Sequence, residues 1–408
     1  MKFDELNLHQ SLTKAIKELK YETPTSIQQQ AIPIILNNKD VLGSAQTGTG
    51  KTAAFALPIL HHLINQKNSS KKIKTLVVTP TRELAIQIAE NFTYYAKYTN
   101  ITNTVIFGGV KQGSQTDRLK KGVDILVATP GRLLDLMGQG YISLDDIGFF
   151  VLDEADRMLD MGFINDVKKI LEKLPNDRQS LFFSATMPKN IIEFSNKILK
   201  NPEKVIAHKT SSTANTIKQF LYLTNKSTKK DLLLHILKDR NISQILVFSR
   251  TKHGADRIVR NLKKKNINAA AIHGDKSQNQ RQKTLKDFKE NNIRVLVATD
   301  IAARGIDIDQ LNYVLNYDIP NEAETYVHRI GRCGRAGNKG VSISISEPEE
   351  NIYVKAIEKL IAKKIEIISE QPFKQTEKPM NAQQKKEFEK EKNRKKQEFF
   401  KNRKKKRR

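Results

Sequence analysis

Short apolar runs alternate with longer helix-like segments along most of the chain. In the first half, these runs are rich in β-branched and aromatic residues: "TLVVTP" (75–80), "VIFGG" (105–109), "DILVATP" (124–130), "FFVLDEAD" (149–156) and "SLFFSAT" (180–186). A continuous apolar run between helices is typical of a parallel strand that is buried on both faces. The pattern therefore predicts an α/β domain with helices covering both faces of a parallel sheet.

The same alternation resumes after residue 216 and predicts a second α/β domain. Between the two sets of strands, "HKTSSTANT" (208–216) is rich in Ser and Thr and has no apolar periodicity, which is typical of a linker. We expect the two domains to span 1–207 and 217–368. The later apolar runs are "QILVFS" (244–249), "AAAIHG" (269–274), "RVLVATD" (294–300), "YVLNYD" (313–318) and "VSISIS" (341–346).

The last part of the sequence has a different composition. Residues 381–408 contain fourteen Lys or Arg and four Glu, and we expect 369–408 to be a basic tail without a fixed fold. A block of like charge does not pack into a core, but it can neutralise a nucleic-acid backbone. A solvated tail that keeps the protein soluble would explain the composition as well, so both interpretations stay open.

Overall composition narrows the class of protein. The chain has 408 residues, which is long for one core, and a formal net charge of +27 from 71 Lys and Arg against 44 Asp and Glu. This charge favours polyanionic partners. Cys333 is the single cysteine, which excludes an intrachain disulfide and a multi-cysteine zinc site. No stretch approaches the roughly 18 consecutive apolar residues of a membrane span, so we expect a cytoplasmic protein without a membrane partner.

The segment "AQTGTGKT" (45–52) carries the strongest chemical signal. It follows the strand-like "DVLG" and precedes an apolar helix-like stretch. A glycine-rich backbone at such a junction can wrap a phosphate chain, while its lysine reaches the β- and γ-phosphates and its threonine hydroxyl ligates Mg²⁺. Alanine stands at the first position, where the usual pattern has glycine. The predicted ATP contacts are Ala45, Gln46, Thr47, Gly48, Thr49, Gly50, Lys51 and Thr52.

Acidic residues end the apolar run "FFVL" (149–152). Burying Asp153, Glu154 and Asp156 would be costly unless a cation meets them there. Nucleotide-bound Mg²⁺ is such a cation, and P-loop ATPases hold it with an acid at a strand end. We expect Asp153 to hold Mg²⁺ together with Thr52, partly through water. Glu154 would orient and polarise the water that attacks the γ-phosphate.

Taken in order, these motifs resemble those of the DEAD-box RNA helicases over residues 1–365. Stretches such as "DEADRMLDMGFI" and "FFSATMP" are most similar to the bacterial RhlE subgroup. The resemblance implies two tandem RecA-like domains that bind ATP and RNA at the cleft between them.

The resemblance also implies an adenine site in "YETPTSIQ" (21–28), within a Q motif that spans residues 1–29. Gln28 would pair with the adenine edge, since an amide can both donate and accept hydrogen bonds. Tyr21 would stack on the base, with Phe3 as its aromatic support. Lys20 stands where the family commonly has glycine, so a difference in the turn is expected here.

Further catalytic groups are implied in the second domain by "ATDIAARGIDI" (298–308) and "HRIGRCGR" (328–335). Asp307 would bind the ribose hydroxyl. Arg332 and Arg335 would reach the γ-phosphate as arginine fingers, and His328 would join the coupling network. Cysteine stands at position 333, where the family usually has threonine, and we expect the finger geometry to survive because both residues are small.

Other motifs resemble the family's RNA-binding and coupling elements. Ser184 and Thr186 of "SAT" would link the state of ATP to domain closure. RNA-backbone contacts are implied for residues in both domains. These are Arg82, Gly109, Thr129, Arg132, Arg250, Arg281, Thr299 and Arg304.

The function implied is an RNA-dependent ATPase that locally unwinds short RNA duplexes or remodels RNA–protein assemblies. An ATP-gated RNA clamp or annealing chaperone with little unwinding is one alternative, and a DNA helicase is another. We expect ATP and Mg²⁺ as cofactors and a monomer that binds single-stranded and short duplex RNA largely without sequence preference. Ribosomal or other RNA–protein assemblies are the candidate larger partners.

Overall fold

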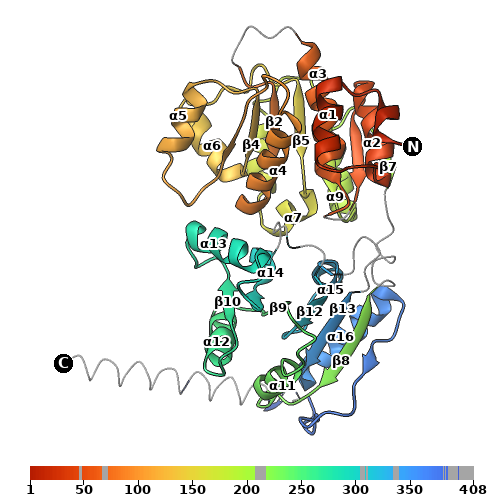
Figure 1. Ribbon diagram of the computed structural model, residues 1–408, viewed down its shortest axis with the longest axis vertical. Coiled ribbons are helices and arrows are strands. Elements are labelled where there is room, and N and C mark those ends of the chain that lie inside the picture. Colours follow the sequence, from red (N-terminus) through yellow and green to blue (C-terminus); the bar gives the residue numbers. More distant parts are fainter. Residues whose placement is uncertain are drawn as a thin grey trace, which may run out of the picture. The chain divides into compact units, whose positions relative to one another are not determined.

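The computed structural model describes residues 1–45, 48–66, 72–206, 217–303, 308, 311–333, 340–379, 381, 383–384 and 394. The predicted linker (208–216) and most of the basic tail lie outside the described residues. The chain divides into two compact units, each built around its own sheet (Figure 1). Within the described part of the chain, no helix combines the length and the apolarity needed to cross a membrane.

The sheet of the first unit has the strand order β3-β4-β2-β5-β6-β1-β7, and its paired strands run parallel. Only β3–β4 and β5–β6 are neighbours both in the sheet and along the chain, and parallel neighbours need crossover connections, as expected for alternating strands and helices. The strands are β1 (Val41–Ser44), β2 (Thr75–Val78), β3 (Asn103–Ile106), β4 (Ile125–Ala128), β5 (Phe149–Leu152), β6 (Gln179–Ser184) and β7 (Glu203–Ile206).

Helices cover both faces of this sheet (Figure 1). Adjacent strand residues such as Val41 and Leu42 belong to two different apolar clusters, because successive side chains point to opposite faces. The first cluster involves η1 (Phe3–Leu6), α1 (Gln10–Glu18), α2 (Ser26–Leu36), α3 (Lys51–Asn65) and α4 (Arg82–Tyr95). The second involves α5 (Gly113–Lys120), α6 (Pro130–Gly138), α7 (Ala155–Asp160), α8 (Ile164–Leu171) and α9 (Lys189–Ser195).

The second sheet has the order β10-β11-β9-β12-β13-β8-β14. Its strands are β8 (Lys218–Leu223), β9 (Ile245–Phe248), β10 (Ala269–Ile272), β11 (Val295–Ala298), β12 (Tyr313–Asn316), β13 (Val341–Ser346) and β14 (Glu366–Ile367). The helices of this half of the chain are α11 (Lys229–Ile236), α12 (Lys252–Lys263), α13 (Gln278–Lys289), α14 (Asp300–Ala303), α15 (Ala323–Ile330), η2 (Pro348–Glu350) and α16 (Asn351–Ile361). The predicted α/β class is confirmed for both halves of the chain.

The second unit continues past β14 in a segment that we call the C-terminal strap (371–377). Thr224 Oγ1 donates to the carbonyl oxygen of Phe373 at 2.6 Å, and Asn225 Oδ1 accepts from the backbone N–H of Thr376 at 2.9 Å. The packed part of this unit therefore runs beyond the domain end predicted from the sequence. Polar side chains make these contacts, so apolar periodicity could not reveal them.

Candidate nucleotide and RNA site

The glycine-rich loop leads from β1 into the N-terminus of α3. Gly48 and Gly50 have positive φ angles of 78° and 89°, a region that glycine adopts readily. A Cβ atom on Gly50 would lie 2.4 Å from Gln28 Nε2, so the loop also needs glycine there for space. Ala45 is buried at the end of β1, where its N–H donates to the Ser184 carbonyl oxygen at 3.1 Å.

Two further predicted ATP contacts lie in the described part of this segment. Thr49 is in the loop, and Thr52 is in the first turn of α3. Gln46 and Thr47 lie outside the described residues. The N-terminus of α3 presents backbone N–H groups and a partial positive charge, which suits a phosphate group.

Gln28 connects α2 to this loop. Its Oε1 accepts from the Thr25 N–H at 2.9 Å, and its Nε2 donates to the Gly50 carbonyl oxygen at 3.1 Å. The side chain is buried. The structure thus places Gln28 against the phosphate loop, while its pairing with adenine stays a prediction.

Tyr21 and Phe3 form an aromatic pair near the same end of α2. Their ring centroids are 6.3 Å apart with an interplanar angle of 29°, and Phe3 is buried while Tyr21 is 40% exposed. An exposed ring backed by a buried one could accept a purine on its free face. Lys20 has a φ of 58°, which explains why glycine would be favoured at this turn.

Lys51 and Asp153 form a buried ion pair at the centre of the site. Lys51 Nζ lies 3.4 Å from Asp153 Oδ1, and both side chains are at most 5% exposed. Burial raises the pKa of Asp153 above its usual value and Glu154 acts in the same direction, while Lys51 opposes both. Among the described residues, Lys51 Nζ has no hydrogen-bond partner. A buried ammonium beside a buried carboxylate fits phosphate oxygens on one side and Mg²⁺ on the other.

Glu154 has an unusual backbone and a cationic partner that the sequence analysis missed. Its φ of 57° and ψ of 48° lie in the left-handed region, which costs a non-glycine residue free energy and is frequent at functional sites. Its Oε2 accepts from Arg157 Nη1 at 2.7 Å, and both side chains are at most 3% exposed. The pair could have been predicted from the spacing of three residues between Glu154 and Arg157 at the start of a helix, because side chains three residues apart in a helix are neighbours.

Asp156 joins the acidic segment to the "SAT" motif. Its Oδ2 accepts from both the backbone N–H and the hydroxyl of Thr186 at 2.9 Å, and its N–H donates to Ser184 Oγ at 3.3 Å. Ser184 Oγ donates in turn to the Thr186 carbonyl oxygen at 2.7 Å. These contacts link the two segments directly, and their coupling role stays a prediction.

Predicted RNA contacts of the first unit follow the carboxyl ends of adjacent strands, where ligands bind in open α/β sheets. Arg82 begins α4 after β2, and Thr129 caps α6 after β4. Arg82 also packs over Gly109, because a Cβ atom on Gly109 would lie 2.2 Å from its Nη1. Arg132 donates to the Val110 carbonyl oxygen at 3.0 Å from Nη2 and to Gln115 from Nη1. The structure thus gathers Arg82, Gly109, Thr129 and Arg132 at one edge.

The predicted residues of the second half of the chain occupy several elements. Arg250 follows β9, Thr299 follows β11, and Arg281 is on α13. His328 is on α15, and Arg332 follows it in a buried position. Arg304, Asp307 and Arg335 lie outside the described residues.

Cys333 is fully buried, and its Sγ donates to the Ile330 carbonyl oxygen at 3.1 Å. A threonine hydroxyl could donate in the same direction, so cysteine serves as a small buried donor here. Nearby, Arg329 donates to both carboxylate oxygens of Asp300, at 2.6 and 2.8 Å. This bidentate pair ties α15 to α14 and was not predicted from the sequence.

Comparison with known proteins gives a consistent assignment. Residues 25–194 match the DEAD/DEAH box helicase family, and residues 228–337 match the helicase conserved C-terminal domain. The chain is 44% identical over 360 residues to the ATP-dependent RNA helicase CshA of Limosilactobacillus reuteri, covering 88% of this chain and 72% of that protein. It is 41% identical over 365 residues to the DEAD-box ATP-dependent RNA helicase RhpA of Helicobacter pylori, covering 90% and 73%.

A solved structure of S. cerevisiae Dbp5 bound to RNA and ADP BeF3 matches with a TM-score of 0.80 and 33% identity, covering 90% of this chain and 95% of that chain. A DEAD box protein from the hyperthermophile Methanococcus jannaschii matches at 40% identity with a TM-score of 0.53, covering 90% and 99%. The likeness to the RhlE subgroup stays a prediction. The chain belongs to the DEAD-box helicase family and consists of two tandem RecA-like units.

Proposed function

We propose that this protein is an RNA-dependent ATPase that uses ATP to unwind short RNA duplexes locally. The observation that carries the proposal is the arrangement after β5, where two adjacent carboxylates each meet a buried cation beside the phosphate loop. Lys51 lies 3.4 Å from Asp153, and Arg157 lies 2.7 Å from Glu154. The CshA and RhpA relatives carry the name of ATP-dependent RNA helicases, which supports the same reaction.

ATP would be held mainly by the loop and the first turn of α3. Lys51 would bind the β- and γ-phosphates, and the loop N–H groups would cradle the phosphate chain. Thr52 and Asp153 would hold Mg²⁺, which offsets the negative charge of the phosphates when it is bound. Gln28 and Tyr21 would recognise the adenine, with Phe3 behind the tyrosine ring.

Glu154 would orient and polarise the attacking water. Its carboxylate must be ionised to accept a proton, and the buried guanidinium of Arg157 favours the ionised form. Arg157 is therefore a positioning residue that acts through Glu154.

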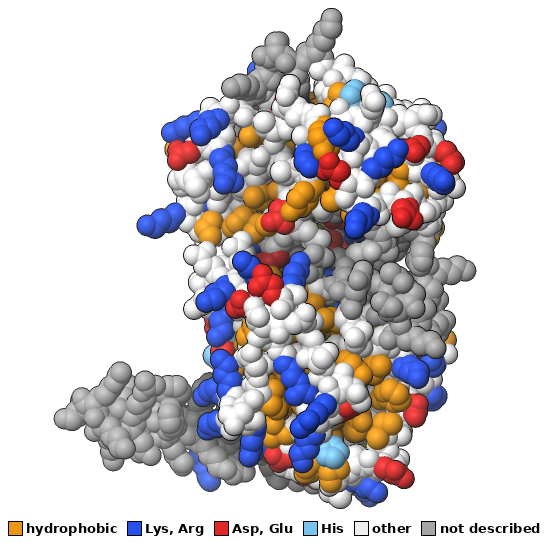
Figure 2. Space-filling model, viewed as in Figure 1, with side chains coloured by type: hydrophobic (Ala, Val, Ile, Leu, Met, Phe, Trp, Pro, Cys, Tyr) orange, Lys and Arg blue, Asp and Glu red, His pale blue; other side chains and the backbone are white. Residues whose placement is uncertain are grey.

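RNA would be held through its backbone rather than its bases. Guanidinium groups such as those of Arg82, Arg132 and Arg250 bind phosphates in a planar, directional geometry. Phosphate contacts fix position but carry no sequence information, so recognition would be largely independent of sequence. Figure 2 shows Lys and Arg side chains interspersed with Asp and Glu over the visible face of both units.

Binding of ATP and RNA would reinforce each other through closure of the two units. Arg332 and Arg335 would then complete the charge stabilisation of the γ-phosphate, and an arginine finger is worth about 10³–10⁵ in rate. Each ligand would raise the affinity of the other by the same factor. The contacts of Asp156 with Ser184 and Thr186 support a link between the ATP site and this closure.

The test is steady-state ATP hydrolysis with and without single-stranded RNA, with DNA of the same length and sequence for comparison. We expect strong stimulation by RNA alone, because reading the 2′-OH discriminates RNA from DNA. Equal stimulation by DNA would favour a DNA helicase. Bound ATP without RNA stimulation would require withdrawing the unwinding activity in favour of an ATP-gated clamp.

A second candidate, an RNA clamp or annealing chaperone, is favoured by the fourteen basic residues between 381 and 408. If about five of these charges contact single-stranded RNA, removing them should flatten the slope of log K against log salt by roughly 3.5. Truncation after residue 379 is the suitable variant, because it keeps the C-terminal strap and its contacts with Thr224 and Asn225. An unchanged slope would assign the tail to solvation only.

A further inference from the structure

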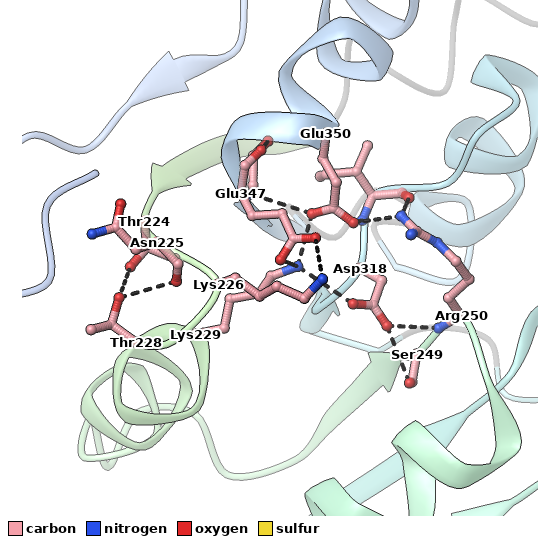
Figure 3. A network of polar contacts seen from close by, with 12 residues as sticks. Thr224, Asn225, Lys226, Thr228, Lys229, Ser249, Arg250, Asp318, Glu347 and Glu350 are labelled. Carbon is pink, nitrogen blue, oxygen red and sulfur yellow. Dashed lines mark hydrogen bonds and ion pairs between the residues drawn. The ribbon is translucent and has the colours of Figure 1, made fainter. Parts of the chain in front are cut away.

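The second unit encloses a group of charged side chains near the ends of β9, β12 and β13. We call it the Glu350 cluster, and Figure 3 shows its members pointing toward one another from separate segments. Three carboxylates and two cations share this site. The members are Lys229, Arg250, Asp318, Glu347 and Glu350.

Glu350 is the most enclosed acid of the cluster, with 2% of its side chain exposed. Its Oε1 accepts from Arg250 Nη2 at 2.5 Å and from the Ile319 N–H at 3.2 Å. Its Oε2 accepts from Lys229 Nζ at 2.8 Å and from the Glu347 N–H at 3.3 Å. Four donors on one carboxylate fix its position, because any rotation would break several hydrogen bonds at once.

Lys229 is the buried cation that lies nearest to Glu350. Its side chain is 4% exposed, and its Nζ lies 2.8, 3.4 and 3.8 Å from Glu350, Asp318 and Glu347. Burial raises the pKa of Glu350 above its usual value, and Lys229 opposes part of this rise. Lys229 thus remains paired with two other acids even if its contact with Glu350 is weakened.

Arg250 is the exposed cation of the cluster, with 43% of its side chain accessible. Its Nη2 donates both to Glu350 and to the Ile319 carbonyl oxygen, the latter at 3.0 Å. Its backbone N–H donates to Asp318 Oδ2 at 2.8 Å, and Ser249 Oγ donates to the same oxygen at 3.2 Å. The backbone of Arg250 is therefore held by Asp318 and its guanidinium by Glu350 and Ile319, while much of its side chain faces solvent.

We propose that Glu350 is a positioning residue that sets the guanidinium of Arg250 for an RNA phosphate, with Lys229 as its counter-ion. The inference rests on the RNA contact of Arg250 in the proposed function. A guanidinium has five donors in a planar fork, so one edge can stay on Glu350 while another binds phosphate. An arginine fixed beforehand loses less rotamer freedom on binding than a free one.

The test compares Glu350→Gln, Arg250→Met and the double variant in the full chain. The affinity for a labelled single-stranded oligoribonucleotide is measured with a non-hydrolysable ATP analogue, together with the KM for RNA and the kcat of RNA-stimulated ATP hydrolysis. We expect Glu350→Gln to weaken RNA binding about three- to tenfold and to raise the KM for RNA more than it lowers kcat. The double variant should bind no more weakly than Arg250→Met, because the two residues act as a unit.

Additive effects of the two substitutions, or tighter RNA binding by Glu350→Gln, would overturn the inference. Tighter binding would mean that Glu350 competes with RNA for Arg250. Unchanged RNA binding by Arg250→Met would instead overturn the RNA contact of Arg250 itself. The two failures are therefore distinguishable.

Two further variants test whether weaker RNA binding by Glu350→Gln results only from a loss of folded protein. Glu350→Asp keeps a negative charge near Lys229 but shortens the side chain by one methylene, so it should weaken RNA binding in the same way. Glu358→Gln on α16 is the matched control, because its carboxylate contacts Lys364 at 2.6 Å and the Ile365 N–H at 3.0 Å outside the cluster. RNA affinity of the control should equal that of the unmodified chain, and an equal loss there would overturn the inference.

Discussion

Arg157 Nη1 donates to Glu154 Oε2 at 2.7 Å inside the first unit, three residues along the chain. Neither side chain has appreciable contact with solvent, and Glu154 holds a left-handed backbone conformation at the start of α7. The pair therefore presents a carboxylate that is fixed in direction and adjacent to Asp153.

Replacing Arg157 with methionine should lower both stability and catalysis. Removing one partner leaves a buried carboxylate without its cation, which typically costs about 3 kcal/mol of unfolding free energy. The variant also loses the contact that fixes the direction of the Glu154 carboxylate, so the kcat of RNA-stimulated ATP hydrolysis should fall. Urea unfolding and steady-state hydrolysis measure the two effects. Arg118→Met, at an exposed position on α5, should change stability by less than about 0.5 kcal/mol.

Glu154→Gln should separate binding from hydrolysis. The amide keeps the size of the side chain but cannot accept a proton, so turnover should fall by roughly 10²–10⁴. ATP and RNA should remain bound together, and RNA should dissociate more slowly in the presence of ATP than in its absence. Equal RNA dissociation rates with and without ATP would contradict the proposed coupling of the two ligands.

Lys20→Gly should stabilise the first unit. Lys20 has a φ of 58°, and this region costs a residue with a Cβ atom about 1–2 kcal/mol relative to glycine. The greater freedom of glycine in the unfolded chain offsets part of the gain, so a net increase of about 0.5–1 kcal/mol is expected. Lys17→Gly, in the last turn of α1, should instead destabilise by up to about 1 kcal/mol. Thermal unfolding of both variants checks the opposite signs.

Asp318→Asn should make the second unit less stable at neutral pH. Burial acts to raise the pKa of Asp318, but Lys229 and Arg250 outweigh it, so the folded-state pKa lies below the usual value. The ionised group therefore contributes stability above the unfolded-state pKa of about 3.9, and this contribution is lost as the pH falls through the folded-state pKa. We expect a loss of about 2 kcal/mol at pH 7 that shrinks below pH ~4.

Urea unfolding of Asp318→Asn from pH 7 downward checks this dependence. Asp231→Asn is the comparison, since its pair with Lys230 is at the surface with 43% of the Asp231 side chain exposed. Surface pairs contribute little, so this variant should follow the unmodified chain at every pH. A pH-independent difference for Asp318→Asn would show that hydrogen-bond geometry rather than charge is responsible.

The parallel α/β fold and the nucleotide loop could be predicted because their signals are local. Buried strands such as Phe149–Leu152 are continuous apolar runs, and the glycines at 48 and 50 mark positions that require positive φ. Lys20, at a position where the family commonly has glycine, likewise has a positive φ of 58°.

Other features could not be predicted because they depend on partners far apart in the chain. Glu350 contacts Arg250 across a separation of 100 residues, and Thr224 contacts Phe373 across 149. No periodicity connects such positions, and polar side chains in loops leave no apolar pattern. Arg157 is an intermediate case, since its spacing from Glu154 is local but its burial depends on the packing of α7 against β6 and α9.

The ion pairs around β5 also have an electrical consequence. Lys51 and Arg157 each face a carboxylate, those of Asp153 and Glu154, and Asp156 adds a further buried acid. Within this group of five described side chains, the formal positive charge does not exceed the negative charge. A magnesium–ATP complex carries about two net negative charges. The balancing charge for a bound nucleotide would therefore have to come from outside this group, for which the proposed arginine fingers are candidates.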